Sequence, residues 1–236
     1  MRAIQKVMYQ GEEIGIGSPG SGYSARVVIP TSGTFTAPKT GIYVFWLTAG
    51  GGAGGYYGSA WASGGGGGAT VPYFVPLQEG DTVTIIIGAG GITNSDQAII
   101  TGGGETSVVL PDGTILTAGG GGAGCYDPNA RNYYGGAGGG GGIAGTGGKP
   151  YTLSGWYCGG HGGSLTNGGV GGSYPGTNGG NGINSFGGNS GNYGLTAAQT
   201  VGRGGGTLNM HGTSTNYGFG GDTAQNGNPG CVVIFY

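Results

Sequence analysis

The sequence predicts an all-β protein: a small β-sandwich or jelly-roll-like sheet that carries a large glycine-rich insertion of packed polyglycine II (threefold) helices, with negligible α-helix. Three observations predict this fold class. Glycine accounts for 68 of the 236 residues, short runs of β-branched and aromatic residues are separated by turn residues, and one such run, at 231–235, ends the chain. Average usage would give about 17 glycines, so the excess decides the class.

The glycine pattern excludes two other classes of protein. Collagen needs glycine at every third position and abundant proline, whereas the run of glycines at 64–68 breaks that period and the chain has only 10 prolines. Flexible glycine-rich linkers are mostly polar, whereas 36% of these residues are hydrophobic and 15 are tyrosines. We therefore expect a folded chain.

The uneven spread of glycine indicates four parts. Seven of the 68 glycines lie before Gly50. Residues 1–24 are interpreted as a leader, residues 25–118 as a β-strand scaffold with the first glycine-rich loops, residues 119–230 as the glycine-rich bundle, and residues 231–236 as a closing strand. Because this last strand has to pair with strands far back in the sequence, the four parts should form one domain around an insertion.

Strands are expected where β-branched and aromatic residues cluster. The sequence Leu110-Pro111-Asp112-Gly113-Thr114 combines the residues that favour a tight turn, so residues 108–116 should form a hairpin. The expected strands are at residues 25–29, 41–48, 71–75, 81–87, 106–110, 114–118 and 231–235.

The glycine runs at 135–142, 159–163, 168–172 and 202–206 can adopt an extended threefold helix of the polyproline II type. Such a helix makes no internal hydrogen bonds, so its N–H and C=O groups must be satisfied by neighbouring helices. Only glycine lets backbones approach closely enough for this on every side. We expect a stiff bundle whose intervening segments emerge at its ends.

Several motifs follow one another in a distinctive order. Gly33-Thr-Phe-Thr-Ala-Pro38 precedes the strand at 41–47 and Gly50-Gly-Gly-Ala-Gly-Gly55, and then come Val71-Pro-Tyr-Phe-Val75, the segment 80–91, Gly104-Glu-Thr-Ser107, Leu116-Thr-Ala-Gly-Gly120 and Asn228-Pro-Gly-Cys-Val-Val-Ile234. The ordered set resembles the glycine-rich domain at the C-termini of many phage tail fibres.

The second half of the chain is also similar to the small tip adhesins of T-even-type phages, in which glycine motifs form a lattice of threefold helices. In that group the segments between the motifs set the host range. Residues 1–23 do not match the group's fibre-attachment domain. Residues 35–45 resemble an early strand of trimeric complement and tumour-necrosis-factor-type jelly rolls, which leaves a homotrimer open as the assembly state.

The resemblance implies a receptor-binding protein at the tail-fibre tip of a virion, made in the host cytoplasm. Its partners would be a bacterial surface receptor, either an outer-membrane protein or a glycan, and other tail-fibre chains through residues 1–24. The chain shows no signal peptide and no membrane-spanning run. Two alternatives are a structural or assembly component of the fibre without receptor binding and an ice-binding protein.

Candidate receptor-contacting residues lie between the glycine runs, where tyrosine and tryptophan supply stiff, half-polar surface and asparagine adapts its hydrogen bonds. Any single ring could equally cap the end of the bundle. Asp127 and Arg131 could orient a receptor or form an internal ion pair. The candidates are Tyr56, Tyr57, Trp61, Tyr126, Asp127, Asn129, Arg131, Asn132, Tyr133, Tyr134, Tyr151, Trp156, Tyr157, Tyr193, His211 and Tyr217.

Catalysis, metals and cofactors are not expected. His161 and His211 have no partnered cysteine or paired carboxylate nearby, and no nucleophile elbow or phosphate loop stands in its required context. Seven scattered Lys and Arg residues and a net charge of −2 argue against nucleic acid as a partner. Cys125, Cys158 and Cys231 lack metal-ligand spacing, and we expect buried thiols.

Overall fold

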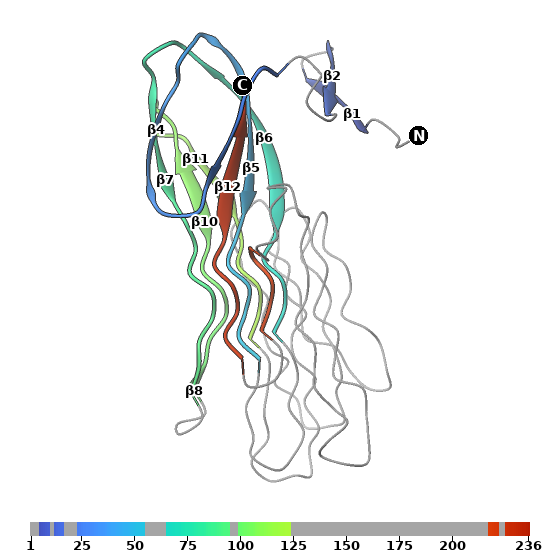
Figure 1. Cartoon of the computed structure of the whole chain (residues 1–236), viewed down its shortest axis with the longest axis vertical. Helices are drawn as coiled ribbons and strands as arrows, with labels where there is room; N and C mark the ends of the chain where they lie inside the picture. Colours follow the sequence, from blue (N-terminus) through green and yellow to red (C-terminus); the bar gives the residue numbers. More distant parts are fainter. Residues whose placement is uncertain are drawn as a thin grey trace.

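The structure is a computed structural model that describes residues 5–9, 12–16, 23–54, 65–94, 99–123, 217–221 and 225–236. Within these ranges all regular elements are β-strands, as the sequence predicts; they are numbered β1 to β12, and Figure 1 labels all of them except β3 and β9. Eight of the strands form two four-stranded antiparallel sheets. The glycine-rich segments continue from one end of these sheets as long, nearly parallel traces (Figure 1).

Strands distant in sequence lie side by side in both sheets. The first sheet has the order β3 (Arg26–Ile29), β12 (Cys231–Phe235), β5 (Gly41–Thr48) and β6 (Thr70–Leu77). The second has the order β11 (Ile115–Ala118), β10 (Thr106–Val109), β7 (Thr82–Ile86) and β4 (Gly33–Thr36).

The closing strand β12 lies between β3 and β5, with Val233 opposite Val28 on one side and Trp46 on the other. The prediction that the end of the chain pairs with strands far back in the sequence is therefore confirmed. Because β12 occupies an interior position in its sheet, the glycine-rich stretch is closed off as an insertion within one folded unit.

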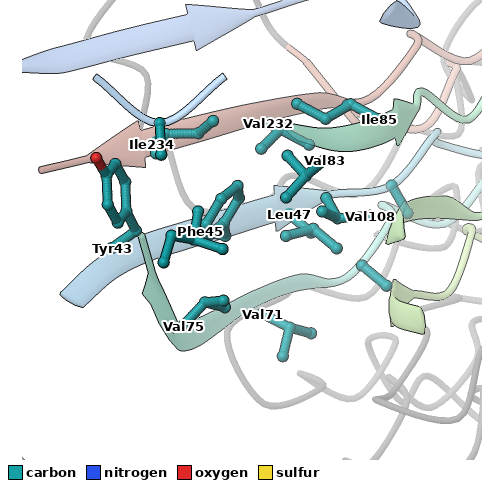
Figure 2. Packing of buried hydrophobic residues seen from close by; sticks show 14 of the residues in the cluster. Tyr43, Phe45, Leu47, Val71, Val75, Val83, Ile85, Val108, Val232 and Ile234 are labelled. Atoms are coloured by element: carbon teal, nitrogen blue, oxygen red, sulfur yellow. The ribbon is translucent and has the colours of Figure 1, made fainter. Parts of the chain in front are cut away.

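The main core lies between the two sheets. Buried and exposed side chains alternate along strand β7, as expected for a strand with one face on the core. Val83 and Ile85 point inward and are fully buried, while Thr82 and Thr84 are exposed. Tyr43, Phe45 and Leu47 of β5 face them, together with Val232 and Ile234 of the closing strand (Figure 2).

The opposite face of β5 and β12 is buried as well. Val44 is 2% exposed and Trp46 is 4% exposed, and both pack with Cys231 and Val233 in a second cluster. This explains why β5 reads as a nearly continuous apolar run and not as an alternating one. Burial of the thiol is confirmed for Cys231, while Cys125 and Cys158 lie outside the described residues.

The predicted hairpin over 108–116 is confirmed. Strands β10 and β11 pair with Val108 opposite Leu116, and the Leu110 N–H donates to the Thr114 carbonyl over 2.8 Å. Gly113 has a φ of 85°, a left-handed conformation that favours glycine. The Asp112 carboxylate accepts a 2.8 Å hydrogen bond from the Thr114 N–H, which completes the turn.

Three pairings were not predicted as strands. Residues 33–36 form β4, because Thr34 pairs with Thr84 of β7 and places Phe35 against the core. Within the leader, β1 (Gln5–Tyr9) and β2 (Glu12–Ile16) pair as a hairpin. The short strands β8 (Thr93–Asn94) and β9 (Ile99–Ile100) form another hairpin. Strands of two residues are too short to show a period in sequence.

Candidate functional site: a glycine lattice with an exposed distal end

Residues 49–54 form the central segment of a lattice, and their N–H groups donate in three directions with a period of three residues. The first direction is segment 65–69, the second is segment 101–104, and the third is segment 225–230. The six bonds run from Ala49 to Ala69 (2.9 Å), Gly50 to Gly104 (3.0 Å), Gly51 to Asn228 (2.9 Å), Gly52 to Gly66 (2.9 Å), Ala53 to Thr101 (3.1 Å) and Gly54 to Gln225 (2.9 Å).

The carbonyl groups of the central segment reach three further neighbours. Gly50, Gly51 and Gly52 accept hydrogen bonds from the N–H groups of Gly121 (2.9 Å), Gly91 (2.8 Å) and Gly221 (2.8 Å), respectively. Six segments therefore surround one threefold helix, three as acceptors and three as donors. This is packing of the polyglycine II type, and it begins at Ala49, in residues that were expected to form glycine-rich loops of the scaffold. The runs for which the sequence predicts it, at 135–142, 159–163, 168–172 and 202–206, lie outside the described residues.

Side chains are excluded from the centre of this lattice. A Cβ atom on Gly51 would overlap the backbone carbonyl of Phe219, and one on Gly52 would overlap the carbonyl of Gly122. Ala49, Ala53 and Ala69 occupy interior positions where a methyl group fits, and all three are fully buried. Close backbone approach, and not a turn conformation, is therefore what requires glycine at these positions.

A layer of threonines joins the sandwich to the lattice. The Thr106 hydroxyl donates to the Thr48 carbonyl over 2.9 Å and accepts the Gly88 N–H over 2.9 Å. The Thr48 and Thr70 hydroxyls lie 3.0 Å apart. All three threonines are buried. They satisfy backbone groups where the two-residue repeat of the strands changes to the three-residue repeat of the lattice.

The lattice has two different ends. Segments 49–54, 88–92 and 119–123 continue from the C-terminal ends of β5, β7 and β11, whereas segments 65–69, 101–104 and 225–230 lead into β6, β10 and β12. We call the end at the sheets proximal and the opposite end distal. The chain end lies beyond the proximal side, where the Tyr236 carbonyl accepts hydrogen bonds from the N–H groups of Ser24 and Ala25, each over 2.9 Å (Figure 1).

At the distal end the described residues form a small uncharged rim, called the distal rim, which comprises Ile92, Thr93, Thr101, Gln225 and Asn226. The Ile92 N–H donates to the Thr101 hydroxyl over 2.9 Å, and the Thr101 N–H donates to the Ile92 carbonyl over 3.0 Å. The Asn226 side-chain oxygen accepts the Thr93 N–H over 2.8 Å. These bonds tie the base of the β8–β9 hairpin to the lattice.

Shifted pKa values occur only on the proximal side of the described chain. Burial raises the pKa of the Cys231 thiol to about 12 and also raises the pKa values of Tyr23 and Tyr73. The Thr114 N–H lowers the pKa of the Asp112 carboxyl. Burial also raises the pKa of the Glu105 carboxyl, whose charge contributes to the raised pKa of Tyr73.

Within the described residues, no three His, Cys, Asp or Glu side chains come together as a metal-binding group. The same part of the chain contains no helix with the length and apolar character needed to cross a membrane.

The glycine-rich character of the lattice is consistent with the result of a comparison of this sequence with known protein families. A family model described as a glycine-rich domain matches residues 30–236. The chain belongs to the glycine-rich domain family. Comparison with curated proteins gave no match. The matched range of this glycine-rich domain includes every lattice segment and all strands of the two sheets except β3, so most of the sandwich and the lattice are parts of one family unit.

Most sequence-predicted site residues of this glycine-rich domain lie outside the described residues. Tyr217 is the exception: it is half-buried and packs against the cluster of Val44, Trp46, Cys231 and Val233, at the proximal end of its lattice segment. The others are Tyr56, Tyr57 and Trp61 in segment 55–64, and Tyr126, Asp127, Asn129, Arg131, Asn132, Tyr133, Tyr134, Tyr151, Trp156, Tyr157, Tyr193 and His211 in segment 124–216.

The sequence analysis missed the distal rim, although a signal for it exists. Asn94, Ser95 and Asp96 are turn-favouring residues that stand just before the β-branched pair Ile99 and Ile100, which is the composition of a short hairpin. The contribution of Asn226 has no local signal, because its bond to Thr93 joins residues far apart in the sequence.

Proposed function

We propose that this chain is a receptor-binding adhesin at the tip of a phage tail fibre, which recognises a bacterial surface receptor through the segments between its glycine-rich runs. The ordered motifs of residues 33–124 and 228–234 support the connection to tail fibres, and family membership supports the glycine-rich domain itself. The proposed location is the virion, with the distal end of the lattice directed towards the host.

The polarity of the molecule is the observation that carries this proposal. Ser24 and Tyr236 meet on the proximal side, so a fibre attached through residues 1–24 would leave the distal end free. Segments 55–64, 95–98 and 222–224 are each attached at both of their ends to distal residues of the lattice. Segment 124–216 starts from the distal residue Ala123 and returns at Tyr217.

Stiffness of the lattice supports the same function. The six neighbours of segment 49–54 hold its backbone through nine hydrogen bonds of 2.8–3.1 Å, without relying on side chains. A surface presented on such a platform loses little conformational freedom on binding, and preorganisation of this kind raises affinity. The aromatic residues between the glycine runs could then be substituted without disturbing the fold, because the platform is built from backbone groups.

Binding to cells tests this proposal directly. Fluorescently labelled chain is incubated with a panel of bacterial strains, and the strain that binds is used for variants. Tyr133→Ala, Tyr134→Ala and Trp156→Ala should each weaken binding while leaving the thermal midpoint within about 2 °C. The matched control is Ile115→Ala, which truncates an exposed apolar side chain of the sandwich. Unchanged binding by all the aromatic variants would contradict the assignment of these residues.

The two alternatives give different results in the same preparation. A structural component of the fibre would associate with like chains or with other fibre chains and leave every strain unbound. An ice-binding protein would produce thermal hysteresis, for which regular flat faces are needed, and the irregular aromatic segments of this chain argue against it. Sedimentation of the purified chain also distinguishes a monomer from the homotrimer that the jelly-roll resemblance leaves open.

A further inference from the structure

We propose that the distal rim is a binding site for an uncharged bacterial surface glycan, in addition to the aromatic segments. This inference rests on the proposed function, because it assigns a receptor class to the end of the lattice that would face the host. None of the five rim residues was among the candidates that the sequence indicated.

The rim lies at the distal end of the lattice, and hydrogen bonds hold its backbone in place, as a binding surface requires. Strand β8 lies at the end of the described lattice segments that points away from the C-terminus (Figure 1), and the Asn226 side chain and the Thr101 hydroxyl hold the backbone of the hairpin. Ala53 and Gly54 of the central lattice segment donate to the carbonyls of Thr101 and Gln225. The rim is therefore an extension of the stiff lattice.

The chemistry of the rim matches sugar hydroxyl groups. The Gln225 side chain is exposed and forms no hydrogen bond within the described part of the chain, so its amide offers both a donor and an acceptor. Asn226 is also exposed; its oxygen is engaged by Thr93, which leaves the amide N–H₂ as a donor. Paired donors and acceptors of this kind suit neighbouring hydroxyls on a sugar ring.

Ile92 supplies the apolar contact. Its side chain is 55% exposed, although the rest of its lattice segment is glycine and alanine. Covering this side chain on binding would add favourable burial, and the apolar C–H face of a sugar can do so. The rim contains no tryptophan, tyrosine, methionine or arginine, the residues enriched where proteins bind other proteins. These features favour a glycan over a protein receptor.

Charge further restricts the ligand. All five rim residues are uncharged. An acidic polysaccharide would find no cation among them, and the adjoining sequence, which contains Asp96 and Asp222, supplies none either. We therefore assign a neutral glycan, which hydrogen bonds and apolar contact recognise without a charged group.

The experiment uses whole labelled chain, the strain that binds it, and two rim variants with matched controls. Ile92→Ser removes the exposed apolar group, and Ile115→Ser makes the same change at a 60% exposed isoleucine on the sandwich. Gln225→Glu introduces a charge at the rim. Gln78→Glu makes the same change at an exposed glutamine between β6 and β7, away from the rim. Both rim variants should weaken cell binding about tenfold or more, and both controls should bind as the unaltered chain does.

Treating the cells identifies the receptor class. Mild periodate, which oxidises sugar diols, should abolish binding, whereas protease treatment should leave it intact. Binding that survives periodate and is lost after protease overturns the glycan assignment. Rim variants that bind normally overturn the rim proposal alone, because the unaltered chain still binds. Failure of the unaltered chain to bind any strain removes the proposed function and this inference together.

Discussion

Thr106 donates its hydroxyl hydrogen to the main-chain carbonyl of Thr48 across 2.9 Å, at the level where the sandwich becomes the lattice. The same oxygen accepts the Gly88 N–H, so one side chain satisfies backbone groups from two other segments. All of these groups are buried away from water, and an unsatisfied buried backbone group is costly. The transition from the sandwich to the lattice therefore depends on the hydroxyl group of Thr106. Valine has a similar shape but lacks this group.

Thr106→Val tests this junction. The substitution keeps the shape of the side chain but leaves the Gly88 N–H and the Thr48 carbonyl without this partner, so the free energy of unfolding should fall by about 2–4 kcal/mol. Denaturant unfolding measures the change. Thr82→Val is the control, because the Thr82 hydroxyl contacts Thr36 in an exposed position and its loss should cost less than about 0.5 kcal/mol. Equal effects at the two sites would contradict the role of the junction.

Glycine is required in the lattice to different degrees at different positions. At Gly52 a Cβ would overlap the Gly122 carbonyl, so Gly52→Ala should destabilise the fold by about 3 kcal/mol or more. At Gly102, on the exposed edge, the nearest atom would be 3.0 Å away, and Gly102→Ala should cost less. Gly33→Ala, with no atom within 4 Å, should change the thermal midpoint least. A different rank order would contradict the packing.

Amide hydrogen exchange measures directly whether the N–H groups of the lattice are hydrogen-bonded. The N–H groups of Gly51, Gly52 and Gly66 donate to carbonyls of neighbouring segments and should exchange slowly. The Gly102 N–H donates to no group in the described part of the chain, and Gly102 is exposed, so it should exchange fast. Amide exchange followed by NMR resolves these glycines. Fast exchange at Gly51 and Gly52 would rule out the threefold packing of segment 49–54.

Stability should fall at alkaline pH because the fold keeps the Cys231 thiol protonated. The thiol pKa is about 12 in the folded chain against 9.0 for an ordinary thiol. A pKa that folding raises contributes stability that is complete below pH 9 and is lost between about pH 9 and pH 12. At pH 10.5 the loss should be about 2 kcal/mol.

Cys231→Ala isolates this contribution, since burial also raises the pKa values of Tyr23 and Tyr73, and these remain in the variant. Unfolding free energies measured from pH 8 to pH 11 should decline less steeply for the variant than for the unaltered chain. Parallel curves would show that the thiol is not responsible for the alkaline loss.

The C-terminal tyrosine anchors the proximal side. The Tyr236 ring stacks on Tyr43 with centroids 5.4 Å apart and lies 5.7 Å from Phe35. Tyr236→Ala should lower the free energy of unfolding by about 2 kcal/mol, as measured by denaturant unfolding. Tyr236→Phe retains the ring and should be nearly neutral. If both variants behave alike, the ring contacts do not contribute.

Local chemistry predicted the turn at 110–114 because each of Pro111, Asp112 and Gly113 favours it for its own reason, and these reasons act within a few residues. The strand at 33–36 was not predicted, because Thr34-Phe35-Thr36 is too short to distinguish from a loop without its partner β7. The Asn226 contact to Thr93 was equally inaccessible, since loop composition carries no information about partners far away in the sequence.

For the part of the chain that the structure describes, the sequence by itself determined that the regular elements are β-strands, that glycine replaces an ordinary core beyond the sheets, and that the last strand closes an insertion. Composition and periodicity are sufficient for these conclusions, because they reflect how each residue constrains its own backbone. Only the tertiary structure decided which segments surround residues 49–54, where the distal end lies, and which residues form its rim. Those features depend on hydrogen bonds between distant segments, and the pattern within any one glycine run is the same whichever neighbours satisfy it.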